Sequence, residues 1–344
     1  MKCSLIVNER ARRSAKSEGG FTLLELLVAV TITLVLTGLM LAVVTSTLNL
    51  WHRTQDGFST SAQTKLALDM IERDLQAAVF RKDGGTWFAV DVTNTPAMLA
   101  AHGWITSPSI KPANSDSQRL LPDMTDGTAP SIGQARFGLS GAWLRFVTTN
   151  VEAGGSLPIV VSYQVARRPL SGAVDVANPA ELRYTLFRSA VSTEKTFARG
   201  NDVTAPAYGS ASTAPASSRN PATVTNPNNA DALATNVVDF GIWLYVRDST
   251  AGMRRIFPAD NSDISHAAHD TGAAPDNTRF PDMADVMVRI LTERGAALLA
   301  EIESGGGRLT RPAVYASDAE WWWAVVEANS RIYSRRVEVK GGAL

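Results

Sequence analysis

The chain has 344 residues, of which 45% are hydrophobic, enough for one large domain with appendages or for two small domains. Its 33 basic and 33 acidic side chains cancel, so the overall charge gives no indication of a nucleic-acid partner. The charge is uneven, however, because residues 1–20 carry five basic and two acidic side chains. The only cysteine is Cys3, and a chain trimmed beyond it has no disulfide, thiol nucleophile or cysteine-based zinc site.

The N-terminal residues are polar and basic up to Gly20, and an apolar run then extends from Phe21 to about Leu50. The only charged residue within this run is Glu25. As a helix, the run would be about 45 Å long, more than the roughly 30 Å of a bilayer's hydrocarbon core. The sequence therefore predicts a transmembrane helix over 21–50. The basic leader before it places the N-terminus in the cytoplasm and the rest of the chain in the periplasm.

The order of these features differs from that of a secretory signal peptide, whose small-residue cleavage site follows the apolar region. Here the small residue, Gly20, precedes the apolar run, and no A-x-A pattern follows it. Cleavage after Gly20 would occur at the cytoplasmic face and would leave the apolar segment on the mature protein as an anchor. The pair Arg12-Arg13 raises the alternative of a twin-arginine signal, but the surrounding residues do not support it.

The sequence GFTLLE at residues 20–25 resembles the class III signal of type IV pilins and type II secretion pseudopilins. This resemblance implies that a prepilin peptidase removes the leader 1–20 by cleaving after Gly20 and methylates the new N-terminal Phe21. It also implies that the mature protein sits in the inner membrane and assembles with other pilins or pseudopilins through a secretion or pilus machinery. The alternative is a plain single-span anchor in which GFTLLE occurs by chance.

A carboxylate inside a bilayer costs several kcal/mol unless it is paired. Glu25 would be the fifth residue of the mature chain, in the first helical turn, where the helix dipole favours a negative charge. The resemblance supplies a partner, the α-ammonium of Phe21 on a neighbouring subunit, so we predict an assembly role for Glu25. The alternative is that Glu25 lies at the headgroup level and complements only its own helix dipole. Both roles can hold at once.

The helix is predicted to continue beyond the membrane, because no proline occurs before Pro96 and the pattern becomes amphipathic over 51–82. The following segment, 83–344, is predicted to be a globular, pilin-like domain rich in β-strands. The predicted fold class is therefore α+β. It consists of a long N-terminal helix, transmembrane in its first half and amphipathic in its second, packed on a largely antiparallel sheet.

Alternating apolar and polar residues predict strands, and few helical patterns separate them, which favours antiparallel pairing. The predicted strands lie near residues 143–148, 159–165, 182–186, 238–246, 286–290 and 332–339. Two later helices are predicted at 293–303 and 318–328. The stretch 93–135 looks irregular, and the low-complexity stretch 200–231 is predicted to be a disordered or surface loop.

The C-terminal body resembles minor pseudopilin J of type II secretion in three short segments. These are IERDL at 71–75, VVDF at 237–240 and FPD at 280–282. The chain differs from that pattern in its length, in its low-complexity insert and in a tryptophan-rich helix near the C-terminus. A second possible affiliation is with the pseudopilin-like proteins of Verru_Chthon gene cassettes.

The sequence contains no phosphate-binding loop, H-E-x-x-H or G-x-S-x-G motif, so we predict no enzymatic activity and no cofactor. One weak metal candidate is the group Asp260, Asp263, His266 and His269. A helix would place both imidazoles on one face, and a loop would offer carboxylates to calcium. The spacing matches neither a zinc motif nor an EF-hand, and the alternative is a solvated acidic loop between strands.

Three adjacent tryptophans, Trp321, Trp322 and Trp323, span about 200° of a helix and cannot all face one core. They indicate either core packing with one residue at the rim or an aromatic contact for another subunit. For the whole chain, the main hypothesis is a structural subunit of a type IV pilus or a type II secretion-type filament. The alternative is a filament-tip or membrane-anchored binding protein that recognises an adhesion target or a cargo.

Overall fold

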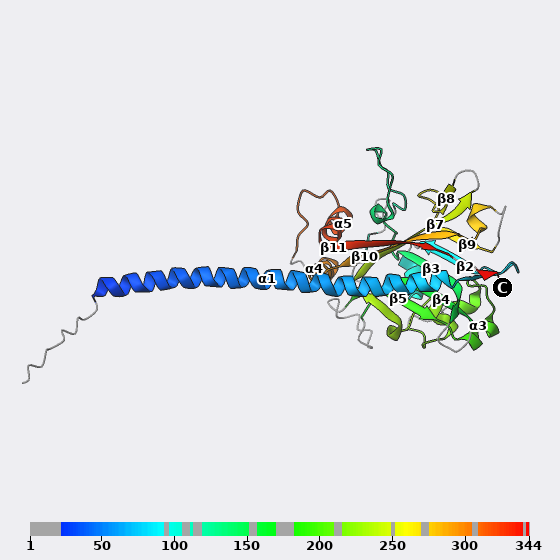
Figure 1. The fold of residues 1–344 in the computed structure, drawn as a ribbon, viewed down its shortest axis with the longest axis horizontal. Coiled ribbons are helices and arrows are strands. Elements are labelled where there is room, and N and C mark those ends of the chain that lie inside the picture. The colour runs from blue at the N-terminus through cyan, green and yellow to red at the C-terminus, as the bar shows by residue number, and fades with distance from the viewer. Residues whose placement is uncertain are drawn as a thin grey trace, which may run out of the picture. The chain divides into compact units, whose positions relative to one another are not determined.

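A computed structural model of the chain describes its residues from Thr22 onward, with gaps. The described ranges are 22–92, 96–104, 111–112, 119–150, 157–169, 182–209, 215–248, 252–269, 275–304, 309–339 and 342–343. The chain divides into two compact units, Met1–Gln55 and Asp56–Leu344. The first helix, α1 (Leu23–Gln76), begins in the N-terminal unit and ends in the C-terminal unit (Figure 1).

The last turns of α1 belong to the C-terminal unit because their apolar face is buried there. Ala67, Leu68, Ile71 and Leu75 recur at helical spacing and are at most 5% exposed. The predicted domain boundary at residue 83 therefore differs from the division that the structure shows, which falls after Gln55.

The helix ends at Gln76, and the prediction that it continues to residue 82 is wrong. The chain changes conformation because tertiary pairing begins at once. Ala78 bridges to Thr148, and the Thr149 N–H donates to the Ala77 carbonyl at 3.1 Å. These backbone bonds compete with helical ones for the same groups.

Two antiparallel sheets form the body of the C-terminal unit. The six-stranded sheet has the order β6 (Ala232–Thr235), β5 (Arg183–Ala190), β4 (Leu157–Arg168), β3 (Ala142–Asn150), β2 (Phe88–Val92) and β9 (Ser265–Ala268). The four-stranded sheet has the order β11 (Ser330–Glu338), β10 (Met283–Leu291), β7 (Val237–Asp248) and β8 (Gly252–Phe257). A short parallel pair joins β1 (Val79–Phe80) to β12 (Gly342–Ala343).

Four further helices accompany the sheets in the described part of the chain. They are α2 (Pro96–Ala101), α3 (Thr193–Arg199), α4 (Glu293–Ser304) and α5 (Asp318–Asn329). The predicted fold class is confirmed: the N-terminal helix is apolar, and the C-terminal domain is built on antiparallel sheets. All six predicted strands and both predicted later helices are present, whereas β1, β2, β6, β8, β9 and β12 were not predicted.

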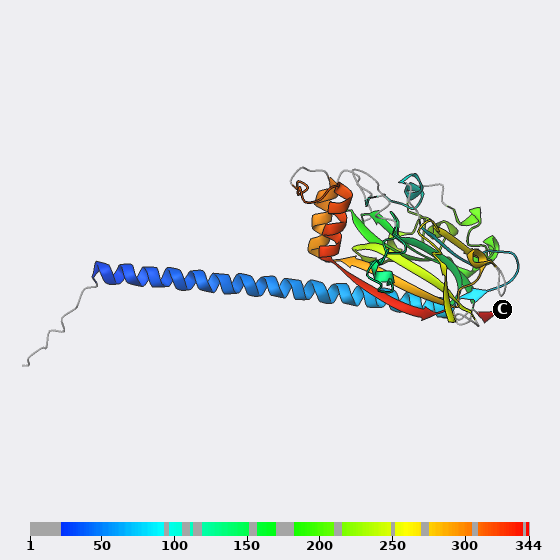
Figure 2. The same cartoon turned by 90° about the horizontal axis from the view of Figure 1, so that it is seen from above.

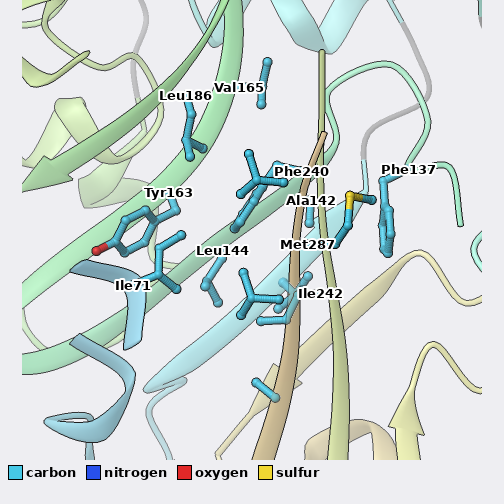
Figure 3. Packing of buried hydrophobic residues seen from close by; sticks show 14 of the residues in the cluster. Ile71, Phe137, Ala142, Leu144, Tyr163, Val165, Leu186, Phe240, Ile242 and Met287 are labelled. Atoms are coloured by element: carbon cyan, nitrogen blue, oxygen red, sulfur yellow. The ribbon is translucent and has the colours of Figure 1, made fainter. Parts of the chain in front are cut away.

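Side chains of the two sheets and of α1 meet in one core (Figure 3). Leu144 and Tyr163 come from the six-stranded sheet, and Phe240 and Ile242 come from β7 in the other sheet. The core is closely packed around the ring of Phe137. A Cβ atom on Gly241 of β7 would lie 2.1 Å from that ring, so only glycine fits at this position.

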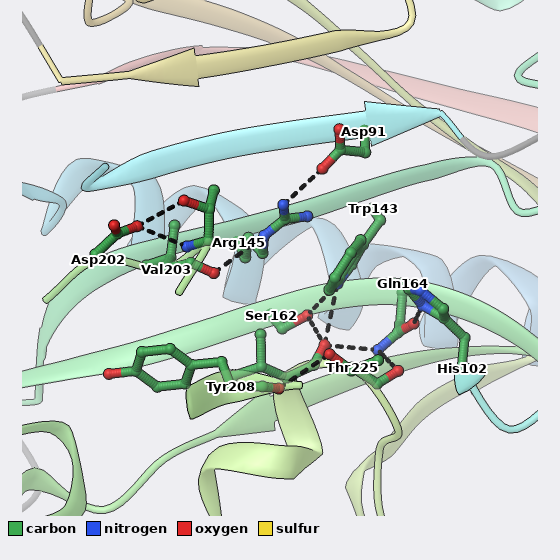
Figure 4. Close-up of polar contacts among 12 residues, drawn as sticks. Asp91, His102, Trp143, Arg145, Ser162, Gln164, Asp202, Val203, Tyr208 and Thr225 are labelled. Atoms are coloured by element: carbon green, nitrogen blue, oxygen red, sulfur yellow. Dashed lines mark hydrogen bonds and ion pairs between the residues drawn. The ribbon is translucent and has the colours of Figure 1, made fainter. Parts of the chain in front are cut away.

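The low-complexity stretch 200–231, predicted to be a disordered or surface loop, consists in its described parts, 200–209 and 215–231, of short 3-10 helices joined by loop, and residues 223–227 are buried. The carbonyl of Val224 accepts hydrogen bonds from Trp143 Nε1, Ser162 Oγ and Gln164 Nε2 at 2.9–3.0 Å (Figure 4). A buried strand face with polar side chains needs acceptors, and this segment provides them. Composition alone does not show that requirement.

Candidate functional site

The N-terminal part of α1, Leu23–Leu48, has a mean hydropathy of 2.6, and its side chains are exposed along its whole length. Its 26 residues would extend about 39 Å, enough to cross a bilayer's hydrocarbon core. Among the described residues, no other helix is long and apolar enough to do so. Threonine hydroxyls in this segment donate to carbonyls one turn back, as Thr33 does to Ala29 at 2.7 Å, so they are satisfied within the helix.

Glu25 forms a capping box with Thr22 at the start of α1. The Glu25 carboxylate oxygen Oε2 accepts from the Thr22 N–H at 2.9 Å and from the Thr22 hydroxyl at 3.0 Å. In return, the Glu25 N–H donates to Thr22 Oγ1 at 3.2 Å. This reciprocal pattern satisfies backbone donors that a helix N-terminus otherwise leaves unpaired. Within the described residues, the second carboxylate oxygen, Oε1, has no hydrogen-bond partner.

The residues predicted for cleavage and methylation, Gly20 and Phe21, lie outside the described residues, as does Cys3. The structure begins immediately after them, at Thr22. Their roles therefore remain predictions from the sequence.

The C-terminal end of α1 is attached to the six-stranded sheet by the carboxylate of Asp74. Asp74 accepts from the Tyr163 hydroxyl at 2.5 Å and from two nitrogens of Arg188 at 2.8 and 3.1 Å. Burial raises the pKa of Tyr163 well above its usual range, so the phenol remains protonated and donates to the carboxylate. This network fixes the end of the helix against β4 and β5.

The same helix is also held by β11 in the other sheet. Arg335 forms ion pairs with Asp69 and Glu72, both at 2.6 Å, and the hydroxyls of Ser61 and Tyr333 are 2.8 Å apart. The part of α1 in the C-terminal unit is therefore attached to both sheets. Asp69 and Glu72 are three residues apart and share a helix face, but nothing in the sequence identifies their arginine partner.

The four weak metal candidates do not form a ligand set. His266 lies on β9, where it is 2% exposed, and its Nε2 is 3.0 Å from the carbonyl oxygen of Arg279. Asp260 and Asp263 accept from backbone N–H groups of their own turn, and His269 Nδ1 is 3.2 Å from the Ala267 carbonyl oxygen. Across the described ranges, no three His, Cys, Asp or Glu side chains gather where they could hold a metal.

The solvated-loop interpretation is wrong at His266, because this residue is part of a strand that pairs with β2. Burial lowers the pKa of His266 to about 4. The folded protein therefore keeps this imidazole neutral at a pH where the unfolded chain protonates it. The free energy of unfolding is therefore not reduced by this group above pH 6.5. It falls as the pH drops from 6.5 to about 4, because over this range the unfolded chain binds a proton that the folded protein does not.

We expect the free energy of unfolding to fall by about 3 kcal/mol between neutral pH and pH 4 through this group, since one pKa unit corresponds to about 1.4 kcal/mol. Denaturant unfolding of wild type and His266→Gln over this pH range measures the effect. Glutamine can still donate to the Arg279 carbonyl but does not titrate, so the variant should lose less stability in acid. The matched control is His269→Gln, and an identical pH dependence in all three proteins would contradict the assignment.

The three tryptophans occupy different environments on α5. Trp322 and Trp323 are 3% and 2% exposed, whereas Trp321 is half-buried at the rim. This arrangement confirms the interpretation of core packing with one residue at the rim. Cationic groups of Lys111, Arg136 and Arg289 lie 4.6–5.8 Å from the centre of the Trp323 ring.

A buried ionic network joins α5 to the six-stranded sheet. The Glu303 carboxylate on α4 accepts from Arg167 Nε at 2.9 Å, from the Tyr184 hydroxyl at 2.6 Å and from Trp322 Nε1 at 2.9 Å. Burial raises the pKa of Glu303, and the Arg167 guanidinium lowers it in part. The prediction from sequence missed this network, because its members lie on four elements that are distant along the chain.

A second buried pair, Lys111 and Asp239, was also missed. The Lys111 ammonium is 3.0 Å from Asp239 Oδ1, and neither side chain is exposed. Asp239 also accepts from the Phe137 N–H at 3.1 Å. Each charge is thus paired in the interior, as burial requires. These buried pairs join elements of the domain that are distant in the sequence.

Comparison with known proteins found one match. Residues 15–41 match the family described as the prokaryotic N-terminal methylation motif. No curated protein and no solved structure matched the chain. The matched segment includes Glu25 and the beginning of the apolar helix. This motif supports a membrane-anchored, single-pass subunit of the pilin or pseudopilin type, which a prepilin peptidase processes and which assembles with other pilins, rather than an enzyme.

Proposed function

We propose that the chain is a minor pilin- or pseudopilin-like structural subunit of a type IV pilus or a type II secretion-type filament. It is cleaved after Gly20 and methylated on the amino group of Phe21. The methylation motif at 15–41, which runs directly into the apolar helix, carries the proposal. In this role the chain acts through the surfaces by which it packs against other subunits. The filament's assembly machinery supplies the energy for assembly.

The proposed orientation follows from charge. Residues 1–20 carry five basic side chains, which favour the cytoplasmic side of a membrane. The C-terminal unit then lies on the opposite, periplasmic side of the inner membrane. Its ion pairs with Asp69, Glu72 and Asp74 hold the last turns of α1 against the sheets within that unit.

The resemblance of three short segments to minor pseudopilin J favours a related role, and each segment lies at the start or end of an element of this fold. The segment 71–75 forms the end of α1 and contains Asp74. The segment 237–240 opens β7 and contains the buried Asp239. The segment 280–282 leads into β10, where Asp282 accepts from the Arg247 N–H at 2.6 Å.

A groove supports the second candidate function, a filament-tip binding protein. Its volume is about 620 Å³, and it runs along α5 beside the half-buried Trp321, with Leu309 and Arg311 on its walls. An aromatic ring beside a charged group is typical of interface residues. The methylation motif and the membrane helix serve this function equally, as its anchor.

The test of processing is the mass of the mature protein extracted from its membrane. We expect an N-terminus at Phe21 that carries one methyl group. Gly20→Val should leave the precursor uncut in the membrane, because a larger side chain does not fit a cleavage pocket shaped for glycine. An intact Met1, or a start beyond Leu50, would refute the proposal.

A further inference from the structure

β11 is an edge strand of the four-stranded sheet, and β10 is its only strand partner among the described residues. An edge strand leaves a row of backbone donors and acceptors unpaired, and natural proteins usually cover or guard it. Figure 2 shows β11, in red, as the outermost strand beside the part of α1 in the C-terminal unit. The groups at this edge can be identified from the register of the pair.

Backbone hydrogen bonds beyond both ends of the pair define that register. The Thr292 N–H donates to the Asn329 carbonyl, and the Val339 N–H donates to the Asp282 carbonyl, both at 2.9 Å. Hydrogen-bonded pairs alternate along an antiparallel ladder, so the odd-numbered residues of β11 direct their N–H and C=O groups toward β10.

The even-numbered residues of β11 therefore present their backbone groups to the free edge. These residues include Ile332, Ser334 and Arg336. Within the described residues, no hydrogen bond to their N–H or C=O groups is present. The edge thus offers a regular series of donors and acceptors at the spacing of a β-strand.

The free edge opens into a groove of about 680 Å³ between β11 and α1. Residues from both elements line it: Ser61, Ala62, Lys65, Leu68, Ile332, Tyr333, Ser334 and Arg335. The contact between Ser61 and Tyr333 and the ion pairs of Arg335 hold the helix and the strand in place. Ile332, which lines the groove, is 43% exposed, so apolar surface accompanies the free backbone groups.

The charge of this edge distinguishes among possible occupants. β11 carries three arginines, of which Arg335 is paired with Asp69 and Glu72 on α1 and Arg336 is paired with Asp285 on β10. No carboxylate lines the groove itself. Lys65 and Arg331 are exposed and make no ion pair with a described residue. A second copy of β11 would add another Arg331 and no unpaired carboxylate to this edge, whereas an acidic strand would supply the carboxylates that Lys65 and Arg331 lack.

We propose that the free edge of β11 accepts an extended, acidic strand from a different subunit of the same filament. The added strand would be the fifth of this sheet, bonded to the backbones of Ile332, Ser334 and Arg336, with its carboxylates near Lys65 and Arg331. This mode is β-strand addition, in which main-chain bonds give affinity and side chains give specificity. The identity of the donor as a filament subunit rests on the proposed function.

The binding test uses the full chain in detergent micelles and two synthetic peptides of roughly seven residues, about the length of a strand. One peptide alternates valine with glutamate, and the other alternates valine with lysine. Fluorescence anisotropy should show at least tenfold tighter binding of the glutamate peptide. Hydrogen exchange should slow at the amides of Ile332, Ser334 and Arg336, whereas Tyr333 and Arg335 should not change because they already bond to β10.

Two variants separate the backbone contribution from the side chain. Ser334→Pro removes an outward N–H without breaking the ladder to β10, a position at which an edge strand tolerates proline. It should weaken binding of the glutamate peptide at least tenfold and should keep the thermal transition of wild type. Ser334→Ala keeps the N–H and should bind like wild type. The double variant Lys65→Glu, Arg331→Glu should reverse the preference between the two peptides.

The proposal would be overturned if the glutamate peptide bound Ser334→Pro and wild type equally well. It would also be overturned if neither peptide bound the protein. In the second case the basic edge acts only as a guard against aggregation. That result leaves the proposed function intact if the mature protein still begins at Phe21 and enters filaments. Conversely, failure of processing would remove the filament as the source of the strand, while the peptide assay would still decide whether β11 binds one.

Discussion

Glu25→Leu should insert into the membrane and be cleaved after Gly20 as wild type is, yet it should fail to assemble with partner pilins. Leucine removes a charge that is costly in a bilayer, so insertion does not suffer. Assembly should suffer, because we propose that the second oxygen, Oε1, which has no hydrogen-bond partner among the described residues, pairs with the Phe21 ammonium of a neighbouring subunit. Removing one partner of such a pair in a low-dielectric environment costs about 3–5 kcal/mol.

Crosslinking or co-purification of wild type and Glu25→Leu from the same membranes measures this effect. The control is Thr22→Val, which removes the hydroxyl bonds of the capping box but keeps the carboxylate. If pairing between subunits is the main role, Thr22→Val should recover its partners and Glu25→Leu should not. Equal recovery by Glu25→Leu and wild type would show that Glu25 serves only its own helix.

The elements that were predicted correctly are those whose signal is local. In β7 and β10 every second residue is apolar, over 238–246 and 284–290, and both strands lie at the buried centre of their sheet. The helix α5 has its own start signal, because the Ser317 hydroxyl accepts from the Glu320 N–H at 3.1 Å. Such features can be read from neighbouring residues without knowledge of the rest of the fold.

The missed strands depend on partners that are distant in sequence. β9 has four residues, and its pairing with β2 makes it a strand. β8 buries only its last two residues, so its pattern is not that of a core strand. The end of α1 was misplaced for a related reason. Val79 continues the helical spacing of Leu75, but the bridge between Ala78 and Thr148 redirects the chain.

In the candidate site, too, features with a local sequence signal could be predicted, and features that depend on distant residues could not. The GFTLLE motif is contiguous, so processing and the special position of Glu25 could be predicted from it. The attachments of α1 and the buried ion pairs could not. Asp74 and Arg188 are separated by 114 positions, and Arg167 and Glu303 by 136. A charged residue looks the same in a sequence whether water or another side chain solvates it, and only the fold distinguishes the two.

Arg167→Met should lower the free energy of unfolding by about 3–5 kcal/mol, because it leaves the buried Glu303 carboxylate without its cation. The side chains of Arg167 and Glu303 are 1% and 3% exposed, so water cannot replace the lost partner. Denaturant unfolding at neutral pH measures the change. The surface pair Arg247 and Glu338 has nearly the same separation, 3.0 Å, and Arg247→Met should cost less than about 1 kcal/mol.

The double variant Arg167→Met, Glu303→Met shows whether an unpaired charge is the cause. If it is, the double variant should be more stable than Arg167→Met alone, because two apolar side chains can fill the space of a buried ion pair at little cost. Burial already raises the pKa of Glu303, and losing Arg167 should raise it further. The penalty in Arg167→Met should therefore shrink as the pH falls through that raised pKa, where the carboxyl becomes neutral. The opposite result would be a double variant whose loss of unfolding free energy is the sum of the two single losses, with a loss in Arg167→Met that does not change with pH. Packing around Tyr184 and Trp322, and not the charge pair, would then hold α4 and α5 against the sheet.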